Sequence, residues 1–164
     1  MTDAVDGKAL VRAYLDDVFS HGNVANMERY LAGDAFMASV ADLVRRWRTA
    51  FPDFEISVAR VIAEDDRVVT VEILSGTHDG VFESSLGPIA PTGRRVEWSR
   101  IAIRRLDGDR FVEGVFEEDE VGLLRQMDAL SVTDPWAASH RSGSDPARRN
   151  PFGVRGAPGE DVPE

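Results

Sequence analysis

One set of side chains in this 164-residue sequence has the types and spacing that acid–base chemistry needs. In residues 67–75, 95–104 and 110–118, alternate side chains would point to the same face of a sheet. The more polar of the two faces consists of Thr70, Glu72, Leu74, Trp98, Arg100, Arg104, Glu113, Val115, Glu117 and Asp119. A carboxyl group in a dry pocket has a raised pKa and can both remove and return a proton, so Asp119 is a candidate acid–base group.

The opposite face of these segments is almost entirely apolar, with Val69, Val71, Ile73, Ile101, Ile103, Val112 and Phe116. Two interpretations remain open. Either the polar face lines a pocket while the apolar face packs against a second copy of the chain, or the polar face is solvated, as in many antiparallel sheets. Arg100 is expected to pair across strands with Glu72 or Glu113, and its alternative role is to bind a substrate carboxylate.

The remaining candidates also have structural interpretations. Asp119 stands where the N-cap of a following helix would stand. Tyr14 lies on the apolar stripe of the first expected helix, where its hydroxyl would need a partner. His78 lies in residues 76–80, which have the composition of a turn, so we expect an exposed imidazole that titrates near neutral pH. Trp47 and Trp98 could stack on a planar substrate or belong to the core.

The elements that would position these residues come in the order helices, then strands. Apolar residues recur at helical spacing in 6–20 and 38–50, with a short helical segment at 26–31 between them. The period then changes to two, which predicts strands at 54–62, 67–75, 81–85, 95–104 and 110–118 and a last helix at 120–130. This order predicts an α+β domain with its helices on one side of a mostly antiparallel, curved sheet.

Composition changes after residue 130, where residues 131–164 hold five of the eight prolines. We therefore predict one domain at 1–130 and a disordered tail at 131–164. The net charge of −10 argues against nucleic acid or an anionic membrane as a partner. The N-terminal residues lack a signal-peptide pattern and no segment is apolar enough to span a membrane, which predicts a cytoplasmic protein.

Several kinds of site lack their sequence signals. The chain has no cysteine, which excludes thiolate chemistry, and its three histidines lack the spacing of metal ligands. A glycine-rich phosphate loop and a G-x-S-x-G nucleophile motif are also missing from the sequence. We therefore expect neither a metal nor another cofactor.

A series of short motifs in the second half of the domain has a familiar order and spacing. They are Phe51-Pro52-Asp53, Asp66-Arg67-Val68-Val69, Gly76-Thr77-His78, Pro91-Thr92-Gly93-Arg94, Asp107-Gly108, Val112-Glu113, and Asp119 followed by Gly122-Leu123-Leu124-Arg125-Gln126. In these residues the chain resembles the SnoaL-like polyketide cyclase family of the NTF2-like superfamily. The resemblance implies a cone of three N-terminal helices over a strongly curved sheet, an apolar pocket between them, and a homodimer.

The resemblance also implies an activity. Cyclases of this family close a polyketide ring by an intramolecular aldol reaction without a cofactor, and the position of their pocket aspartate matches Asp119. A related isomerase branch binds an oxyanion with a tyrosine of the first helix, which Tyr14 could match. Two departures concern the substrate: Val115 stands where many relatives have tryptophan, and the connection at 33–39 is short and lacks a histidine.

These observations lead to two expectations about function. The first is a cofactor-free cyclase or isomerase that acts on a hydrophobic carbonyl compound. Its expected catalytic groups are Asp119, Tyr14 and His78, and its expected substrate-binding residues are Trp98, Trp47, Arg100, Glu113 and Val115. The alternative is a non-catalytic domain of the same superfamily that binds a small molecule or dimerises.

Overall fold

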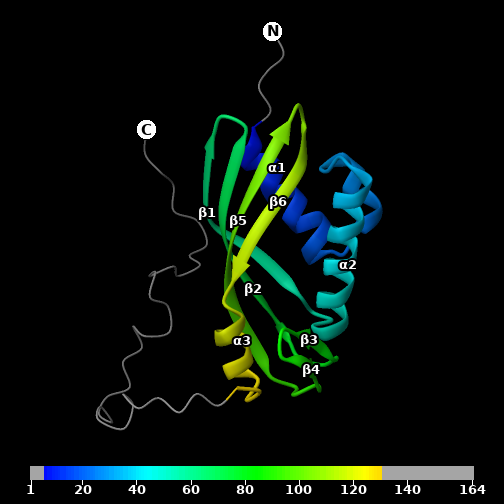
Figure 1. Ribbon diagram of the computed structural model, residues 1–164, viewed down its shortest axis with the longest axis vertical. Helices are drawn as coiled ribbons and strands as arrows, with labels where there is room; N and C mark the ends of the chain where they lie inside the picture. Colours follow the sequence, from blue (N-terminus) through cyan, green and yellow to red (C-terminus); the bar gives the residue numbers. More distant parts are fainter. Residues whose placement is uncertain (1–5, 131–164) are drawn as a thin grey trace, which may run out of the picture. The chain divides into compact units, whose positions relative to one another are not determined.

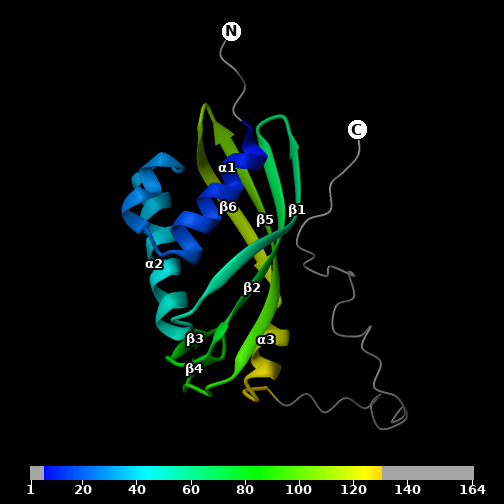
Figure 2. The ribbon, with the colours of Figure 1, turned by 180° about the vertical axis from the view of Figure 1, so that it is seen from behind.

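The structure is a computed structural model that describes residues 6–130 (Figures 1 and 2). The predicted tail at 131–164 lies outside the described residues. Helix α1 (Gly7–Tyr14) continues directly into the π-helical segment η1 (Leu15–Ser20). The 3₁₀ segment η2 (Val24–Arg29) and helix α2 (Asp34–Ala50) follow, so the short predicted helix is a 3₁₀ segment and α2 begins earlier than residue 38.

The strands form an antiparallel sheet and a small separate hairpin. Strands β1 (Glu55–Glu64), β2 (Arg67–Thr77), β5 (Arg95–Asp107) and β6 (Arg110–Glu118) pair in the order β1-β2-β5-β6. The hairpin consists of β3 (Phe82–Ser84) and β4 (Gly87–Ile89), and helix α3 (Glu120–Gln126) follows β6. Figures 1 and 2 show α1 and α2 on the same side of the curved sheet, which confirms the predicted α+β architecture.

Strand register decides which side chains face the helices. Arg100 lies opposite Glu72 on one side and Glu118 on the other, so all three occupy the face that α1 and α2 cover. The pairing of β5 with β6 shifts between Arg105 and Leu106. This irregularity reverses the alternation expected for β6, because one extra residue moves every later side chain to the other face.

The reversal corrects the faces predicted for β6. Phe116 lies opposite Ala102 and faces the helices, not the outer side as predicted. Val115 and Glu117 lie opposite Ile103 and Ile101, respectively, and Glu113 lies opposite Arg105. These three residues therefore belong to the outer face of the sheet rather than to its polar, helix-covered face.

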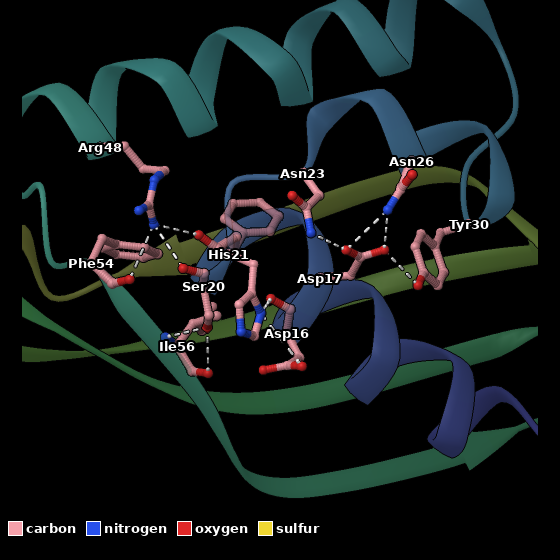
Figure 3. Close-up of polar contacts among 11 residues, drawn as sticks. Asp16, Asp17, Ser20, His21, Asn23, Asn26, Tyr30, Arg48, Phe54 and Ile56 are labelled. Atoms are coloured by element: carbon pink, nitrogen blue, oxygen red, sulfur yellow. Dashed lines mark hydrogen bonds and ion pairs between the residues drawn. The ribbon is translucent and has the colours of Figure 1, made fainter.

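Polar contacts connect η1 with η2 and with the C-terminal end of α2 (Figure 3). The Asp17 carboxylate accepts hydrogen bonds from Asn23 at 2.7 Å, from Asn26 at 3.0 and 3.2 Å, and from the Tyr30 hydroxyl at 2.9 Å. Arg48 of α2 donates to the carbonyl oxygens of Ser20 at 2.8 Å and of Phe19 at 3.2 Å. The Asp17 bonds hold η1 to η2 and its flanking residues, and the Arg48 bonds hold η1, with the candidate-site residue Phe19, to α2.

The segment 76–80 packs against the end of α2 rather than forming an exposed turn, because its glycines allow a close approach; Gly76 and His78 are buried, and Asp79 is exposed. A Cβ atom on Gly80 would lie 1.9 Å from the carbonyl oxygen of Thr49, and one on Gly76 would lie 2.7 Å from Phe51. The amides of Asp79 and Gly80 both donate to the carbonyl of Ala50. His78 is consequently fully buried, which contradicts the prediction that it is exposed.

Candidate functional site

A cavity of about 250 Å³ lies between the helices and the helix-covered face of β5 and β6. Its wall is mostly apolar, and its polar groups come from a tyrosine, a serine and two arginines. The lining residues are Tyr14, Phe19, Phe36, Ser39, Val40, Leu43, Arg100, Ala102, Arg104, Gly114, Val115 and Phe116. Such a lining, apolar with a few convergent polar groups, is typical of a small-molecule site.

Two arginines of the cavity share one buried carboxylate. Glu72 is fully buried, and its Oε2 atom lies 2.7 Å from Nε and 2.6 Å from Nη2 of Arg100. Its Oε1 atom lies 2.8 Å from Nη1 of Arg104 and accepts a 2.6 Å hydrogen bond from the Thr70 hydroxyl. Thr70 also accepts a 2.8 Å bond from Arg104, so the carboxylate is fixed on both sides. Of the two partners expected for Arg100, the structure contains Glu72 and not Glu113.

Aromatic rings hold the Arg100 guanidinium from several sides. Its central carbon lies 5.3 Å from the ring centre of Phe19, 5.5 Å from that of Trp47 and 5.0 Å from that of Phe116. Such contacts are attractive, because the face of an aromatic ring carries negative electrostatic potential. Although Nη2 of Arg100 is close to Glu72, it forms no hydrogen bond of good geometry, and it is buried.

Electrostatics assign different protonation states to the acidic groups beside the cavity. Burial alone would raise the pKa of Glu72, but Arg104, Arg100 and the Thr70 hydroxyl outweigh it and lower the pKa, so Glu72 is a carboxylate. Burial raises the pKa of Tyr14 to about 12, against the lowering effect of Arg104 and Arg100. Tyr14 therefore remains a neutral hydroxyl that can donate a hydrogen bond into the cavity.

Glu118 is a site residue that sequence reasoning missed. It lies directly across from Arg100 in the sheet and two residues along β6 from Phe116; both of those residues line the cavity, and Glu118 lies next to them without being part of the lining. Its Oε2 atom accepts a bond of 3.4 Å from the Trp98 indole. Burial raises the pKa of Glu118, and Arg100 only partly offsets this effect. The only sequence signal for Glu118 is the alternation of side chains along β6. It assigns Glu118 to the helix-covered face only when the irregular pairing with β5 is taken into account.

The predicted residues of β6 and its following turn lie outside the cavity or at its edge. Asp119 is the N-cap of α3, and its carboxylate accepts a 2.8 Å hydrogen bond from the amide of Gly122. Glu113 is exposed and pairs with Arg67 at 3.1 Å and with Arg105 at 3.0 Å. Val115 is part of the cavity wall, but its side chain is 67% exposed and lies opposite Ile103 on the outer face.

The other predicted residues divide between cavity and core. Arg100 and Tyr14 line the cavity together. Trp47 and Trp98 are buried with their ring centres 5.2 Å apart and support Arg100 and Glu118 from the core side. His78 contacts Phe51 and Phe82, its Nδ1 atom is 3.0 Å from the Thr92 hydroxyl, and burial lowers its pKa. His78 is not part of the cavity lining.

Helix α2 contributes site residues that sequence reasoning did not identify. Phe36, Ser39, Val40 and Leu43 form the wall opposite the sheet. The first two belong to the segment 33–39, which the sequence predicts to be a short connection; in the structure Gly33 is the N-cap and the residues after it form the first turns of α2. Because this segment is helical, it supplies a wall rather than a loop at the cavity.

Residues 6–130 contain neither a metal-binding cluster nor a membrane-spanning helix. In that part of the chain, no group of three or more histidine, cysteine, aspartate or glutamate residues could hold a metal ion. No helix in it is both long and apolar enough to cross a membrane.

Comparison with protein families matches the chain to the model of the SnoaL-like polyketide cyclase over residues 8–127. A search of curated proteins found no match. Among solved structures, a putative polyketide cyclase from Acidithiobacillus ferrooxidans is 23% identical with a TM-score of 0.64, covering 80% of this chain and 100% of that one. A putative SnoaL-like polyketide cyclase from Jannaschia sp. is 18% identical with a TM-score of 0.67, covering 80% of this chain and 98% of that one.

A third similar structure has been assigned a different activity. AclR, a putative hydroxylase from Streptomyces galilaeus, is 22% identical with a TM-score of 0.65, covering 80% of this chain and 91% of that one. At these identities the structural neighbours establish the fold and leave the reaction open. They confirm the predicted NTF2-like arrangement of three N-terminal helices on a curved antiparallel sheet.

Proposed function

Because the chain belongs to the SnoaL-like polyketide cyclase family, we propose that it is a cofactor-free cyclase whose substrate is a hydrophobic carbonyl compound bound in the cavity. The observation that carries this proposal is the pair Arg100 and Arg104 inside an apolar wall, anchored by the single carboxylate of Glu72. Positive groups held in place without water stabilise negative charge that develops on oxygen. A ring closure through an enolate develops such a charge.

The chemistry begins with a proton transfer. Glu118, ionised, removes a proton from the carbon next to a substrate carbonyl, and the electron pair moves to the carbonyl oxygen. Arg100, Arg104 and the neutral hydroxyl of Tyr14 stabilise the resulting enolate oxygen. The raised pKa of Glu118 makes it a stronger base than an ordinary glutamate.

Ring closure and proton return complete the reaction. The enolate carbon attacks a second carbonyl of the same molecule, which forms a carbon–carbon bond and an alkoxide. Glu118, now protonated, returns its proton to that alkoxide, so the enzyme ends in its starting state. The apolar wall favours a folded substrate because it removes apolar surface from water.

The proposal is tested by following hydrogen exchange at carbon rather than by guessing the natural substrate. The bicyclic ketone 2-tetralone exchanges the hydrogens beside its carbonyl for deuterium in D₂O through the enolate, and NMR records the rate. We expect the protein to accelerate this exchange above the buffer rate. An exchange rate equal to that of buffer would contradict the proposal.

A cavity-filling variant supplies the structural control. A Cβ atom at Gly114 would have ordinary contacts of 3.5 Å with Arg104 and Phe36, so Gly114→Ala fits and Gly114→Leu extends into the cavity. We expect Gly114→Leu to abolish the acceleration and Gly114→Ala to reduce it less. Full activity in Gly114→Leu would place the reaction elsewhere.

A second candidate function is binding without catalysis. It is favoured by the fact that Glu72 and Asp119 are already engaged, the first by two arginines and the second by a helix end. In this case the protein would bind 2-tetralone and leave its exchange rate unchanged. The exchange experiment therefore separates the two functions.

The outer face of the sheet supports a homodimer as part of the same proposal. Ile101, Ile103 and Val115 are 50%, 44% and 67% exposed and lie next to one another across β5 and β6. Contiguous exposed apolar residues of this kind mark interaction surfaces. A second copy of the chain would cover them and would approach the cavity only at Val115, which is also part of the cavity wall.

A further inference from the structure

The charges of the ion-paired group beside the cavity do not balance. Arg100 and Arg104 each carry a positive charge, and Glu72 provides the one carboxylate with which they form ion pairs within residues 6–130. Glu118 is nearby, but it accepts its bond from Trp98 and forms no ion pair with either arginine in the described part of the chain. The ion-paired group of Arg100, Arg104 and Glu72 thus has two positive charges and one negative charge, and the ionised Glu118 of the proposed reaction lies across from Arg100 without pairing with it.

The hydrogen-bond donors are also in excess. Glu72 and Thr70 together occupy Nε of Arg100 and Nη1 of Arg104. Nη2 of Arg100 lies 2.6 Å from Oε2 of Glu72 and belongs to that ion pair, whereas within residues 6–130 Nη1 of Arg100 and Nη2 of Arg104 donate no hydrogen bond. A buried donor without an acceptor costs free energy, and a ligand that supplies the acceptor recovers it.

The chemistry of guanidinium specifies what that ligand carries. Its planar array of N–H groups matches a planar oxyanion with delocalised charge better than a single neutral oxygen. The rings of Phe19 and Phe116 flank Arg100 and leave little room for bulk water around it. An oxyanion attached to an apolar body would satisfy both the donors and the wall.

We propose that the cavity binds its ligand as a planar oxyanion, either a carboxylate or the enolate of a 1,3-dicarbonyl, attached to an apolar ring or chain and held by Arg100 and Arg104. This inference rests on the proposed function, since it concerns the same cavity and narrows the class of substrate. It goes further because it states that the ligand is already negatively charged when it binds, before any reaction takes place.

The test compares two ligands of nearly equal shape. Naphthalene-2-carboxylate and naphthalene-2-carboxamide share the bicyclic ring and differ in charge, and isothermal titration calorimetry at neutral pH gives the affinity of each. We expect the carboxylate to bind about tenfold more tightly or better, because charge-assisted hydrogen bonds to arginine are the stronger ones. Equal affinities, or no binding of either compound, would overturn the proposal.

Two neighbouring arginines supply a matched pair of variants. Arg104 lines the cavity, whereas Arg105 lies on the outer face and pairs with Glu113. We expect Arg104→Gln to remove the preference for the carboxylate while the carboxamide still binds, which also shows that the cavity is intact. Arg105→Gln is expected to keep the preference. If Arg104→Gln does not fold, the comparison of the two ligands on the unaltered protein still decides the question.

A third compound distinguishes the two sources of the oxyanion. Benzoylacetone is a 1,3-diketone whose enolate absorbs at longer wavelength than its neutral forms. A cavity that selects the enolate lowers the apparent pKa of bound benzoylacetone, whereas selection of carboxylates alone leaves that pKa unchanged and retains the preference for naphthalene-2-carboxylate. Failure of both signals overturns the inference.

The binding tests of the oxyanion site and the exchange test of the proposed function can fail independently of each other. Selective binding of the carboxylate without exchange of 2-tetralone would retain the oxyanion site and refute catalysis. Exchange of 2-tetralone with equal binding of both naphthalene compounds would retain catalysis and refute the oxyanion site.

Discussion

Glu118 and Asp119 are neighbours in the chain, but their carboxyl groups have different partners. Glu118 faces the helix-covered side of the sheet and accepts a bond from the Trp98 indole, whereas Asp119 caps α3 through the amide of Gly122. Burial raises the pKa of Glu118, whereas the carboxylate of Asp119 is engaged in a hydrogen bond to the first turn of α3. Of these two carboxyl groups, only that of Glu118 is placed beside the arginines of the cavity.

The cap makes a direct prediction about stability. Asp119→Ala removes the acceptor for Gly122 and should lower the free energy of unfolding by about 1 kcal/mol, the usual cost of a lost N-cap. Asp119→Asn should have almost no effect, because asparagine is an equally good N-cap. Urea denaturation followed by circular dichroism measures both variants. Equal stability of the alanine variant and the unaltered protein would show that the cap contributes nothing.

The buried ion pairs predict a large difference between two glutamates. Glu72→Gln leaves two buried arginines without their counter-charge and should cost about 3–5 kcal/mol. Glu113→Gln removes exposed pairs with Arg67 and Arg105 and should cost less than about 1 kcal/mol. Urea denaturation gives both values. Similar losses for the two variants would contradict the burial of the Glu72 network.

Acid should weaken the same network. The pKa of Glu72 is lowered in the folded protein, so its contribution to stability is present above the ordinary value of 4.5 and is lost as pH falls through the lowered folded value. The urea midpoint of the unaltered protein should therefore fall with pH in this range. The difference in stability from Glu72→Gln should shrink over the same range, and a constant difference would argue against an ionised Glu72.

The raised pKa of Glu118 predicts the pH dependence of exchange. A base acts in its ionised form, so the rate with 2-tetralone should rise with pH through an inflection above 4.5, the ordinary value for glutamate. The rate in buffer, measured at each pH, is subtracted. A rate that is already maximal below that value would exclude Glu118 as the base.

The apolar outer face predicts a change in oligomeric state. We expect the unaltered protein to sediment at twice the chain mass of 18.0 kDa at micromolar concentration, and Ile103→Asp to sediment as a monomer. Val121→Asp is the matched control, because Val121 is 54% exposed but belongs to α3. A monomer for the unaltered protein, or dissociation by the control variant as well, would contradict the assignment of this face.

The sequence was sufficient for the architecture because hydrophobic periodicity and turn residues determine it. Helical spacing in the first fifty residues and alternation thereafter predicted the order of the helical segments and of the four strands of the main sheet, but not strand β4. The pairing of Glu72 with Arg100 was also within reach, since both alternate on the helix-covered face and oppose each other in register. In these cases local patterns agree with the tertiary contacts.

The site was less predictable, because one irregular pair of strands reverses the faces of β6. The shift beside Arg105 turns Phe116 and Glu118 toward the helices and Glu113 away from them, and alternation alone does not reveal it. The burial of His78 could not be predicted from the sequence either, because it depends on tertiary contacts of Gly76 and Gly80 with the end of α2. A composition typical of a turn also permits close packing of the backbone.

The most direct test of the account measures deuterium exchange into 2-tetralone with three single variants. We predict that Glu118→Gln abolishes the acceleration above buffer, while Glu117→Gln, which alters the adjacent residue on the outer face, retains it. Asp119→Asn, which preserves the cap, is also predicted to retain it. Loss of exchange in Asp119→Asn with full activity in Glu118→Gln would contradict the account and assign the reaction to the aspartate that the family resemblance indicates.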